Sequence, residues 1–585
     1  MPDGRERAFR AWLVFVLAAG VVLRVAGLWA PLTHDELSAI GRLQFDSFAD
    51  LIRGGVYPDG HPAGMQVMLW LWSRVVGTAA PLLRLPFTLL SAAAIPLIYS
   101  VGRRRYGRMA GLAAATVLAF SQYAVYYAMP VRPYGAGLFF VLLAVHFWTR
   151  ICIEHRDGWG YVAGFALIAA ACAYMHYFCA LTVALLALAG LFVVGRGERR
   201  RYLGACFAAV LLFMPHLGIT RHQLFDLQGV GGWLAAPEPV FLVHYLGYLC
   251  HHSLVVLAVM VVAWALLFDV SPLGGRWRLM LVALTLFVLP LAAGYVYSRS
   301  VNPVLQYSVL IFSWPFLLLA AVGFVGERCS WRHLAACAAI GVALLVSLFA
   351  GRRHYDVLQR EYIASAVDMA RDARRRYGAD NVALYLKISP SMIAYYDTSL
   401  AVAADTGGAP EADYAVVANL FDDSTSAVMR RYPYVVDSRM CTTAPVFLLS
   451  RRAADGEMWP VSRLKEGRVA VDGQYTFLLD TLAADIAADR HFAIVAEAFG
   501  SDSSLQLVME SWVGRRCVDW RSVPLADSVC LPLGQDLCIK SRSDMRRSRI
   551  KIFIFAPDAH PADSVAFRIS TAPADPFRYA VIEEI

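Results

Sequence analysis

The chain has 585 residues, of which 58% are hydrophobic and 17% charged, and its formal net charge is +8. A soluble globular protein of this length carries more charge and fewer apolar residues, so the composition excludes that class. Arginine supplies most of the positive charge, and it clusters between apolar runs instead of forming a basic stripe interleaved with aromatics. This pattern argues against nucleic-acid binding.

The apolar runs of residues 1–350 predict a polytopic α-helical membrane protein with about eleven transmembrane helices. A spanning helix needs about 20 apolar residues. Candidate spans lie near 10–30, 82–102, 108–128, 133–150, 159–176, 179–195, 202–220, 240–268, 278–298, 304–325 and 333–350. The first follows a basic stretch and is too long for a signal-peptide core, so we expect an uncleaved helix.

Residues 63–77 are apolar but too few for an ordinary span, so they form either a short span or a helix at the membrane interface. The arginine-rich loops decide between the two. If the segment is interfacial, the loops at 103–108, 150–156, 196–201, 276–278 and 328–332 all lie on one side, which the positive-inside rule identifies as the cytoplasm. The N-terminus is then cytoplasmic, and residues 31–62 lie on the extracytoplasmic side of a bacterial inner (plasma) membrane.

The first extracytoplasmic loop carries a carboxylate pair. Residues Thr33-His34-Asp35-Glu36 place two acids beside the membrane, where one can act as a general base on a hydroxyl or both can hold a cation near a phosphate. The same residues also fit a capping box at a helix start, with Thr33 as N-cap and Glu36 three residues later. His61 follows in the same loop, and a lone histidine there is more often structural than catalytic.

A second extracytoplasmic segment, residues 121–134, combines four tyrosines with Arg132, which precedes a proline at a helix start. An aromatic belt explains the tyrosines. An arginine at this place suits a phosphate, which it can bind in bidentate geometry. Arg299 is another arginine at the same membrane edge. Together with the carboxylates, the two arginines predict a site for an anionic lipid headgroup with a base beside it.

An ordered series of motifs between residues 10 and 330 resembles the glycosyltransferase family 39 group, which includes protein O-mannosyltransferases and the bacterial aminoarabinose transferase for lipid A. The series runs Leu23-Arg24, Asp35-Glu36, His61-Pro62, Leu83-Arg84-Leu85-Pro86, Gly102-Arg103-Arg104, Tyr106-Gly107, Ala110-Gly111-Leu112, residues 121–134 and His176-Tyr177-Phe178. Members of this group have the GT-C fold, so the resemblance implies a GT-C-like helical domain.

The resemblance also implies an inverting transfer of a sugar from a polyprenyl-phosphate donor to an acceptor hydroxyl on a protein, lipid or polysaccharide. Asp35 matches the base of the family, Glu36 would orient it or assist in binding, and Arg132 with Arg299 would hold the donor phosphate. The other residues expected to bind substrate are His34, His61, Tyr127, Tyr134, His176, Gln306 and Tyr307. No cofactor or metal is required, although a divalent cation is compatible with the carboxylates.

The chain departs from the family pattern at three places. Met129-Pro130-Val131-Arg132 stands where members usually read Gln-Glu-Ala-Arg, His61-Pro62-Ala63 where they read His-Pro-Pro, and Gln306-Tyr307 where they have Arg-Tyr. These departures keep open a non-catalytic protein of glycan assembly. A lipid-linked glycan transporter or flippase is the other alternative, for which we expect internal repeats or broken helices with polar groups at mid-membrane.

From about residue 351 the composition turns polar and mixed in charge, which marks the main domain boundary after a membrane domain of residues 1–350. We expect an extracytoplasmic α/β domain at 351–455, with a helix at 355–377 and strands at 381–388 and 414–419. Short strands near 492–499, 505–512, 550–555 and 564–570 predict an extracytoplasmic β-sandwich at 456–585.

The chain contains eleven cysteines, and most of them lie in or beside apolar runs, where they act as small hydrophobic residues. No Cys-x-x-Cys spacing occurs, which argues against a zinc site. Outside the cytoplasm, the four cysteines of the tail can form disulfides, and the sequence favours no pairing among Cys441, Cys517, Cys530 and Cys538.

Overall fold

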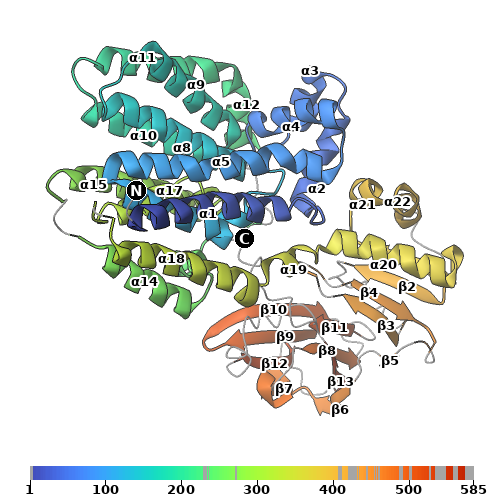
Figure 1. Cartoon of the computed structure of the whole chain (residues 1–585). Helices are drawn as coiled ribbons and strands as arrows, with labels where there is room; N and C mark the ends of the chain where they lie inside the picture. Colours follow the sequence, from blue (N-terminus) through green and yellow to red (C-terminus); the bar gives the residue numbers. More distant parts are fainter. Residues whose placement is uncertain are drawn as a thin grey trace. The chain divides into compact units, whose positions relative to one another are not determined.

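The computed structural model describes residues 4–573 apart from 228–233, 235, 270–272, 328, 406–410, 419–427, 429–430, 433, 440, 443, 445, 453–454, 456, 459–461, 487–491, 500–503, 526–528, 534–547 and 558–563. The described chain forms two compact units, and the boundary between them falls after Tyr355. The first unit is helical, and the second contains the sheets (Figure 1). The predicted domain boundaries at 350 and 455 stay predictions.

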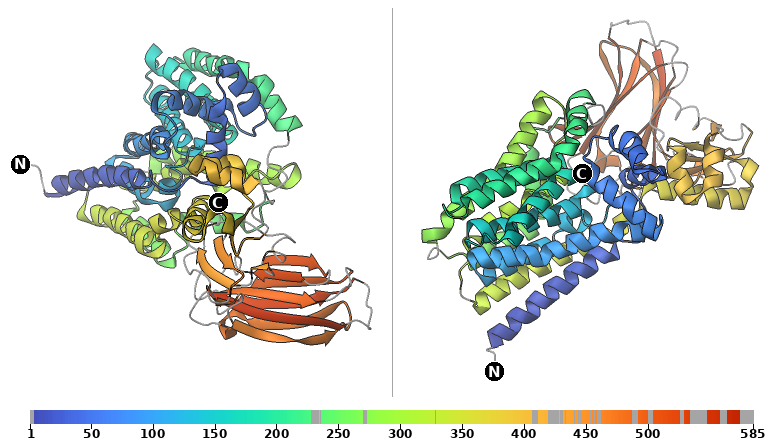
Figure 2. Two further views of the ribbon diagram at one scale, coloured as in Figure 1. Left: turned by 90° about the vertical axis from the view of Figure 1, so that its right-hand side faces the viewer. Right: turned by 90° about the horizontal axis from the view of Figure 1, so that it is seen from above.

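Every predicted span falls on a helical segment of the first unit. The principal helices are α1 (Gly4–Ala26), α5 (Ala80–Tyr106), α6 (Arg108–Phe120), α8 (Pro133–Cys152), α9 (Trp159–Met175), α10 (Tyr177–Val193), α11 (Arg199–Phe213), α13 (Phe241–Leu249), α14 (Leu254–Leu267), α15 (Leu273–Ser300), α17 (Trp314–Val322) and α18 (Trp331–Val346). Helices α1, α5 and α8 run side by side (Figures 1 and 2). The arrangement confirms a multi-pass, many-helix membrane region.

The described helices differ in length and therefore in whether they can cross a membrane. Six are long and apolar enough to cross a membrane, and the number rises to seven if α13 and α14, which bend by 77°, count as one span. Helices α6, α9 and α10 are shorter apolar helices of 13, 17 and 17 residues. Helix α4 (Ala63–Val76) has 14 residues, which is too short for an ordinary span, and its place at the membrane interface stays a prediction.

Short elements connect the long helices at the ends that carry the polar loops. Between α1 and α4 lie α2 (His34–Gly41), η1 (Arg42–Gln44), α3 (Phe48–Asp50) and η2 (Leu51–Val56). The segment α7 (Gln122–Tyr126) follows α6, and η3 (Met214–His216), α12 (Leu217–Arg221) and η4 (His222–Asp226) continue α11. The four-residue α16 (Tyr307–Leu310) precedes α17.

Two glycines of the predicted motif series allow α5 and α6 to cross closely. A Cβ on Gly111 would lie 2.5 Å from the Tyr99 carbonyl oxygen, and one on Gly102 would lie 2.9 Å from the Gly111 Cα. The turn between the helices is at Gly107, whose φ of +100° favours glycine. Helices in membranes pack through small residues of this kind, because close backbone approach maximises van der Waals contact.

Arg24 of α1 is fully buried and completes the end of α6. Its guanidinium donates to the carbonyl oxygens of Leu118 at 2.9 Å and Ala119 at 3.1 Å, and to the Ser91 hydroxyl at 3.2 Å. Because α6 ends at Phe120, these carbonyls lack helical partners, and unsatisfied carbonyls are costly in apolar surroundings. Arg24 therefore faces the interior of the helical unit.

The second unit contains a mixed sheet covered by α20 (Tyr362–Tyr377). Its strand order is β1-β2-β4-β3-β5, with β1 (Val382–Leu386) parallel to β2 (Tyr414–Ala418). The remaining strands, β3 (Tyr434–Arg439), β4 (Val446–Ser450) and β5 (Glu457–Met458), pair antiparallel. Helices α19 (His354–Leu358), α21 (Pro390–Tyr396) and α22 (Thr398–Asp405) complete this part. Both predicted strands are present, and the single helix predicted at 355–377 is divided into α19 and α20.

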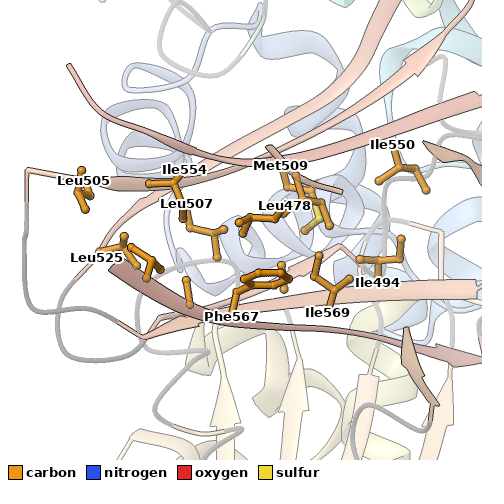
Figure 3. Packing of buried hydrophobic residues seen from close by; sticks show 14 of the residues in the cluster. Leu478, Ile494, Leu505, Leu507, Met509, Leu525, Ile550, Ile554, Phe567 and Ile569 are labelled. Atoms are coloured by element: carbon orange, nitrogen blue, oxygen red, sulfur yellow. The ribbon is translucent and has the colours of Figure 1, made fainter. Parts of the chain in front are cut away.

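Two antiparallel four-stranded sheets form the predicted sandwich. One has the order β10-β9-β12-β7 and the other β11-β8-β13-β6. The strands are β6 (Ser462–Ala470), β7 (Tyr475–Leu482), β8 (Phe492–Phe499), β9 (Gln506–Val513), β10 (Arg516–Pro524), β11 (Val529–Leu533), β12 (Ser548–Phe555) and β13 (Ser564–Pro573), with the short α24 (Ala483–Ile486) after β7. Inward side chains of both sheets, including Leu478, Met509 and Ile569, form one core (Figure 3).

The structure does not decide which cysteines of the second unit form disulfides with one another. Cys441 is a buried free thiol, so it is not in a disulfide in this structure. Cys538 lies outside the described residues, as does the side chain of Cys530.

Candidate active site

The start of α2 is held by the predicted capping box. Thr33 Oγ1 accepts the backbone N–H of Glu36, and a Glu36 carboxylate oxygen accepts the N–H of Thr33 at 3.0 Å. Glu36 is fully buried, and its carboxylate accepts from Arg84 of α5 at 2.7 Å and from the Val131 N–H at 3.0 Å. Its oxygens are occupied by these donors, and the expected role of Glu36 in orienting Asp35 or assisting in binding stays a prediction. Glu36 fastens α2 to α5 and to the segment before α8.

Asp35, the next residue back, faces a cavity. Its side chain is 56% exposed, one carboxylate oxygen lies 3.7 Å from Arg132 Nη2, and the other lies 3.8 Å from His34 Nδ1. The hydrogen bond from the His34 imidazole lowers the pKa of Asp35 to about 2 against the opposing effect of burial, and the positive charge of Arg132 acts in the same direction. Asp35 is therefore an ionised carboxylate at neutral pH.

Arg132 reaches the cavity because the chain before α8 is anchored. Its neighbour Val131 donates a backbone hydrogen bond to Glu36, and Pro133 starts α8 directly after it. Arg132 is 9% exposed, and its Nε is buried without a hydrogen-bond partner in the part of the chain that the structure describes. A buried guanidinium nitrogen without an acceptor is costly, so this group is ready for an anion.

The cavity has a volume of about 340 Å³ and both polar and apolar lining. Its polar lining includes Asp35, His61, Arg132, Tyr134, His176, Tyr177, Gln223, Asn302 and Gln306. Its apolar lining includes Phe178 and Leu181 of α10, Leu224 of η4, Ala293 and Gly294 of α15, and Val304 and Val309. The lining combines a carboxylate, a guanidinium and an extended apolar surface.

His176 lines the cavity at the start of α10, as predicted. Its Nδ1 accepts the backbone N–H of Phe178 at 3.1 Å, so the side chain caps the helix. Its ring centroid lies 5.5 Å from that of His61 and 5.2 Å from that of Phe312. Burial lowers the pKa of His176 well below its usual range, so the ring is neutral and serves packing and capping.

Four predicted substrate ligands do not line the cavity. The exposed His34 side chain lies beside Asp35, and Tyr127 packs behind Tyr134 with ring centroids 4.9 Å apart. Tyr307 packs among Tyr245 and Tyr248. Arg299 donates to the Pro237 carbonyl oxygen at 3.1 Å and lies over the Tyr295 ring. Arg299 therefore does not line the cavity in this structure, and its expected role with Arg132 at a phosphate stays a prediction.

Sequence reasoning missed two residues that shape the cavity. Gln223 of η4 donates to the backbone oxygens of Val56 at 2.7 Å and His61 at 2.9 Å, and accepts from the Tyr177 hydroxyl. Asp59 lies beside His61 in the loop that Gln223 holds. The Asp59-Gly60 pair signals only a turn. Gln223 carries no local signal, because its partners lie about 160 residues earlier in the chain.

Within the described residues, no group of three or more His, Cys, Asp or Glu side chains is placed to hold a metal ion. The carboxylates nearest the cavity are partnered by cations instead: Asp35 by Arg132, Asp59 by Arg42 and Glu36 by Arg84. The arrangement thus offers a base and anion ligands, while metal dependence stays a separate prediction.

Together these features define a multi-pass membrane protein with a base-and-arginine cavity at one end of its helices. Residues 60–219 match the profile of the family described as dolichyl-phosphate-mannose-protein mannosyltransferase. The match includes His61, Arg132 and His176 of the cavity and confirms, over that stretch, the resemblance expected from the ordered motifs. No curated protein sequence matches the chain significantly.

Solved structures similar to this chain include ArnT from Cupriavidus metallidurans. The apo form has a TM-score of 0.49 at 10% identity, covering 76% of this chain and 99% of ArnT. The form bound to undecaprenyl phosphate has a TM-score of 0.48 at 11% identity, covering 75% and 98%. The Archaeoglobus fulgidus oligosaccharyltransferase in complex with Zn and sulfate has a TM-score of 0.30 at 10% identity, covering 89% and 94%.

Proposed function

We propose that the protein transfers a sugar from a polyprenyl-phosphate-linked donor to an acceptor hydroxyl, with Asp35 as general base and Arg132 at the donor phosphate. The observation that carries this proposal is that an ionised carboxylate and a buried guanidinium face one cavity, 3.7 Å apart. The family match supports the donor class, since the family is described by a mannose linked to dolichyl phosphate.

The proposed reaction is a single displacement. The acceptor oxygen attacks the anomeric carbon, the bond from that carbon to the phosphate oxygen breaks, and the acceptor proton passes to Asp35. Asp35 has a lowered pKa of about 2, so it is always ready as a base but a weak one. It therefore takes the proton late, when the hydroxyl has become acidic through bond formation. One displacement inverts the configuration at the anomeric carbon.

The contact between Asp35 and Arg132 couples proton transfer to departure of the phosphate. Before the reaction, the carboxylate partly neutralises the guanidinium. When Asp35 accepts the proton it becomes neutral, and the full charge of Arg132 acts on the phosphate at the moment that the phosphate gains a negative charge. Stabilisation that grows as the reaction proceeds lowers the barrier, whereas equal binding of substrate and transition state does not.

The remaining lining suits the other parts of the donor. A cavity of about 340 Å³ is within the range of small-molecule sites. Its apolar residues from α10 and α15 fit the first isoprene units of a prenyl chain, and Tyr134 and Gln306 offer polar groups for sugar hydroxyls. The donor therefore lies with its phosphate at Arg132 and its lipid along the apolar lining.

The positive-inside rule supports an extracytoplasmic cavity in a bacterial plasma membrane. Arg132 precedes α8, whereas Arg150 lies in the last turn of the same helix, about 30 Å away at the usual rise per residue. Helix α5 likewise carries Arg84 near its cavity end and the Arg103–Arg105 run in its last turn. The arginine-rich ends, which favour the cytoplasm, are thus opposite the cavity.

A lipid-linked glycan transporter is the second candidate, favoured by one observation. Helices α13 and α14 are bent by 77° at a break that contains His251 and His252, both with positive φ. Broken helices with polar groups at the break occur at transporter binding sites. His251 accepts the backbone N–H of Gln122 at 2.9 Å, so the break between α13 and α14 is hydrogen-bonded to the start of α7.

The test of the proposed function compares membranes that contain wild-type protein, Asp35→Asn or Asp46→Asn at matched levels. Asp46 lies in the same loop, exposed and outside the cavity lining, and is the matched control. Loss of the base should slow transfer roughly 10²–10⁴-fold. A polyprenyl-phosphate sugar should then accumulate with Asp35→Asn only, while a glycosylated product disappears. Identical lipid profiles in all three would contradict the assignment and favour transport or a non-catalytic assembly role.

A further inference from the structure

Asp59 is a carboxylate that the proposed reaction does not use, yet it is held by three neighbours. One oxygen accepts from Arg42 Nη1 at 2.6 Å, and the other accepts the Gly60 N–H at 2.9 Å and lies 3.4 Å from His61 Nδ1. Burial opposes ionisation, but the bond to His61 and the charges of Arg42 and Arg132 keep the pKa of Asp59 below its usual range. A fixed negative charge thus lies directly behind a cavity residue.

The contact with Asp59 decides which nitrogen of His61 faces the cavity. A carboxylate accepts hydrogen, so the Nδ1 of His61 carries one and points to Asp59. The other nitrogen, Nε2, is left for the cavity, which the His61 ring lines. Gln223 donates to the His61 backbone oxygen at 2.9 Å, which fixes the loop that carries the ring.

The charged groups around the cavity, counted together with the bound donor, leave one negative charge that a further positive group could balance. Asp35 and Arg132 cancel, Asp59 and Arg42 cancel, and His176 is neutral through burial. A phosphodiester donor brings one negative charge. After transfer, Asp35 is neutral and the departing phosphate monoester has up to two negative charges. In both states one negative charge is unbalanced, and an imidazolium at His61 would balance it.

We propose, building on the proposed function, that Asp59 is a positioning residue that acts through His61, and that protonated His61 donates its Nε2–H to the phosphate as it leaves. The electron pair of the broken bond stays on the phosphate oxygen, and the acceptor proton goes to Asp35. The His61 proton remains on the ring. Its hydrogen bond strengthens as the phosphate gains charge, so it favours the leaving group over the bound donor.

The experiment uses purified full-length protein at pH 7 with two probes that differ by one charge, a short polyprenyl monophosphate and its methyl diester. Wild type should bind the monophosphate more tightly. His61→Gln should reduce that preference roughly tenfold, the scale of one charge-assisted hydrogen bond. Asp59→Asn should reduce it less, and the double variant should match His61→Gln, because Asp59 acts through the ring. A ratio of two affinities is unaffected by the fraction of protein that is folded.

His155→Asn is the matched control. His155 also contacts a carboxylate, Glu198, at 3.5 Å, but it follows the far end of α8, and asparagine tolerates its positive φ. It should keep the wild-type preference. If His61→Gln keeps the wild-type preference for the monophosphate, the inference is overturned and the proposed function is left intact. The same holds if Asp59→Asn still reduces this preference when His61 is already replaced by glutamine. If wild type binds neither probe, the polyprenyl-phosphate proposal fails as well.

Discussion

At the scale of single residues, Asp35 and Glu36 are neighbours in sequence with opposite surroundings. Successive side chains on a helix point about 100° apart, so a pair at the start of α2 cannot face the same way. Asp35 faces the cavity, and Glu36 is buried against Arg84. The capping interpretation and the catalytic interpretation of this pair therefore describe different residues: Glu36 makes the cap, and Asp35 is the candidate base.

This division predicts opposite effects of two conservative substitutions. Glu36→Gln leaves Arg84 charged and 3% exposed without its partner, which should destabilise the fold by about 3–5 kcal/mol. Asp35→Asn should cost much less stability than Glu36→Gln, because its carboxylate is 56% exposed and solvent screens its ion pair. Thermal unfolding of both purified variants in the same detergent checks this. If Arg84→Met added to Glu36→Gln recovers no stability, the buried ion pair is not the cause.

The pKa of Asp35 makes a prediction about acid. A carboxyl whose folded pKa is lowered to about 2 contributes stability above its usual value of 3.8 and loses it as the pH falls through 2. Its charge therefore persists between pH 4 and 8. Transfer rates measured between pH 4 and 8 should therefore show no decrease that arises from protonation of Asp35. An acid limb between pH 4 and 6 whose midpoint shifts in Asp35→Glu would contradict the assigned pKa.

At the scale of elements, the crossing of α5 and α6 depends on the absence of side chains. Gly111→Ala would place a Cβ about 2.5 Å from the Tyr99 carbonyl, and the backbone cannot yield as a flexible side chain can. The strain should cost about 1–3 kcal/mol. Thermal unfolding should show the loss, with Gly204→Ala on α11 as control, since its Cβ meets nothing within 4 Å. Equal stability of both variants would show that the two helices can separate.

At the scale of the whole molecule, the orientation in the membrane can be tested with two matched glycines. Gly41, at the end of α2, and Gly197, between α10 and α11, are both exposed, and a Cβ on either meets nothing within 4 Å. In a background whose native cysteines are replaced by alanine, a membrane-impermeant thiol reagent added outside intact spheroplasts should label Gly41→Cys and spare Gly197→Cys. The reverse pattern would place the cavity on the cytoplasmic side and contradict a donor presented from outside.

Part of the cavity lining could be predicted from the sequence. Asp35, His61, Arg132, Tyr134, His176 and Gln306 were predicted and line the cavity. Arg299 was predicted from its place at a membrane edge, but an edge is a ring around the whole helical unit, and its side chain turns to Pro237. Asp59 was missed because its partner Arg42 is 17 residues away, and no residue pattern near Asp59 indicates the ion pair.

The sequence by itself determined the helical segments, the change to a polar tail and the capping box. It also determined that most cavity residues belong to polar segments at the same end of the helices. These features depend on hydropathy and on neighbours within a few positions, so they are visible in a single chain. Only the tertiary structure decided that Asp35 faces the cavity while Glu36 does not, that Arg299 turns away, and that Asp59 lies behind His61. Those outcomes depend on contacts between segments that are separated along the chain, such as Glu36 with Arg84, Arg299 with Pro237 and Asp59 with Arg42. Hydropathy and neighbouring residues do not determine which of these segments meet.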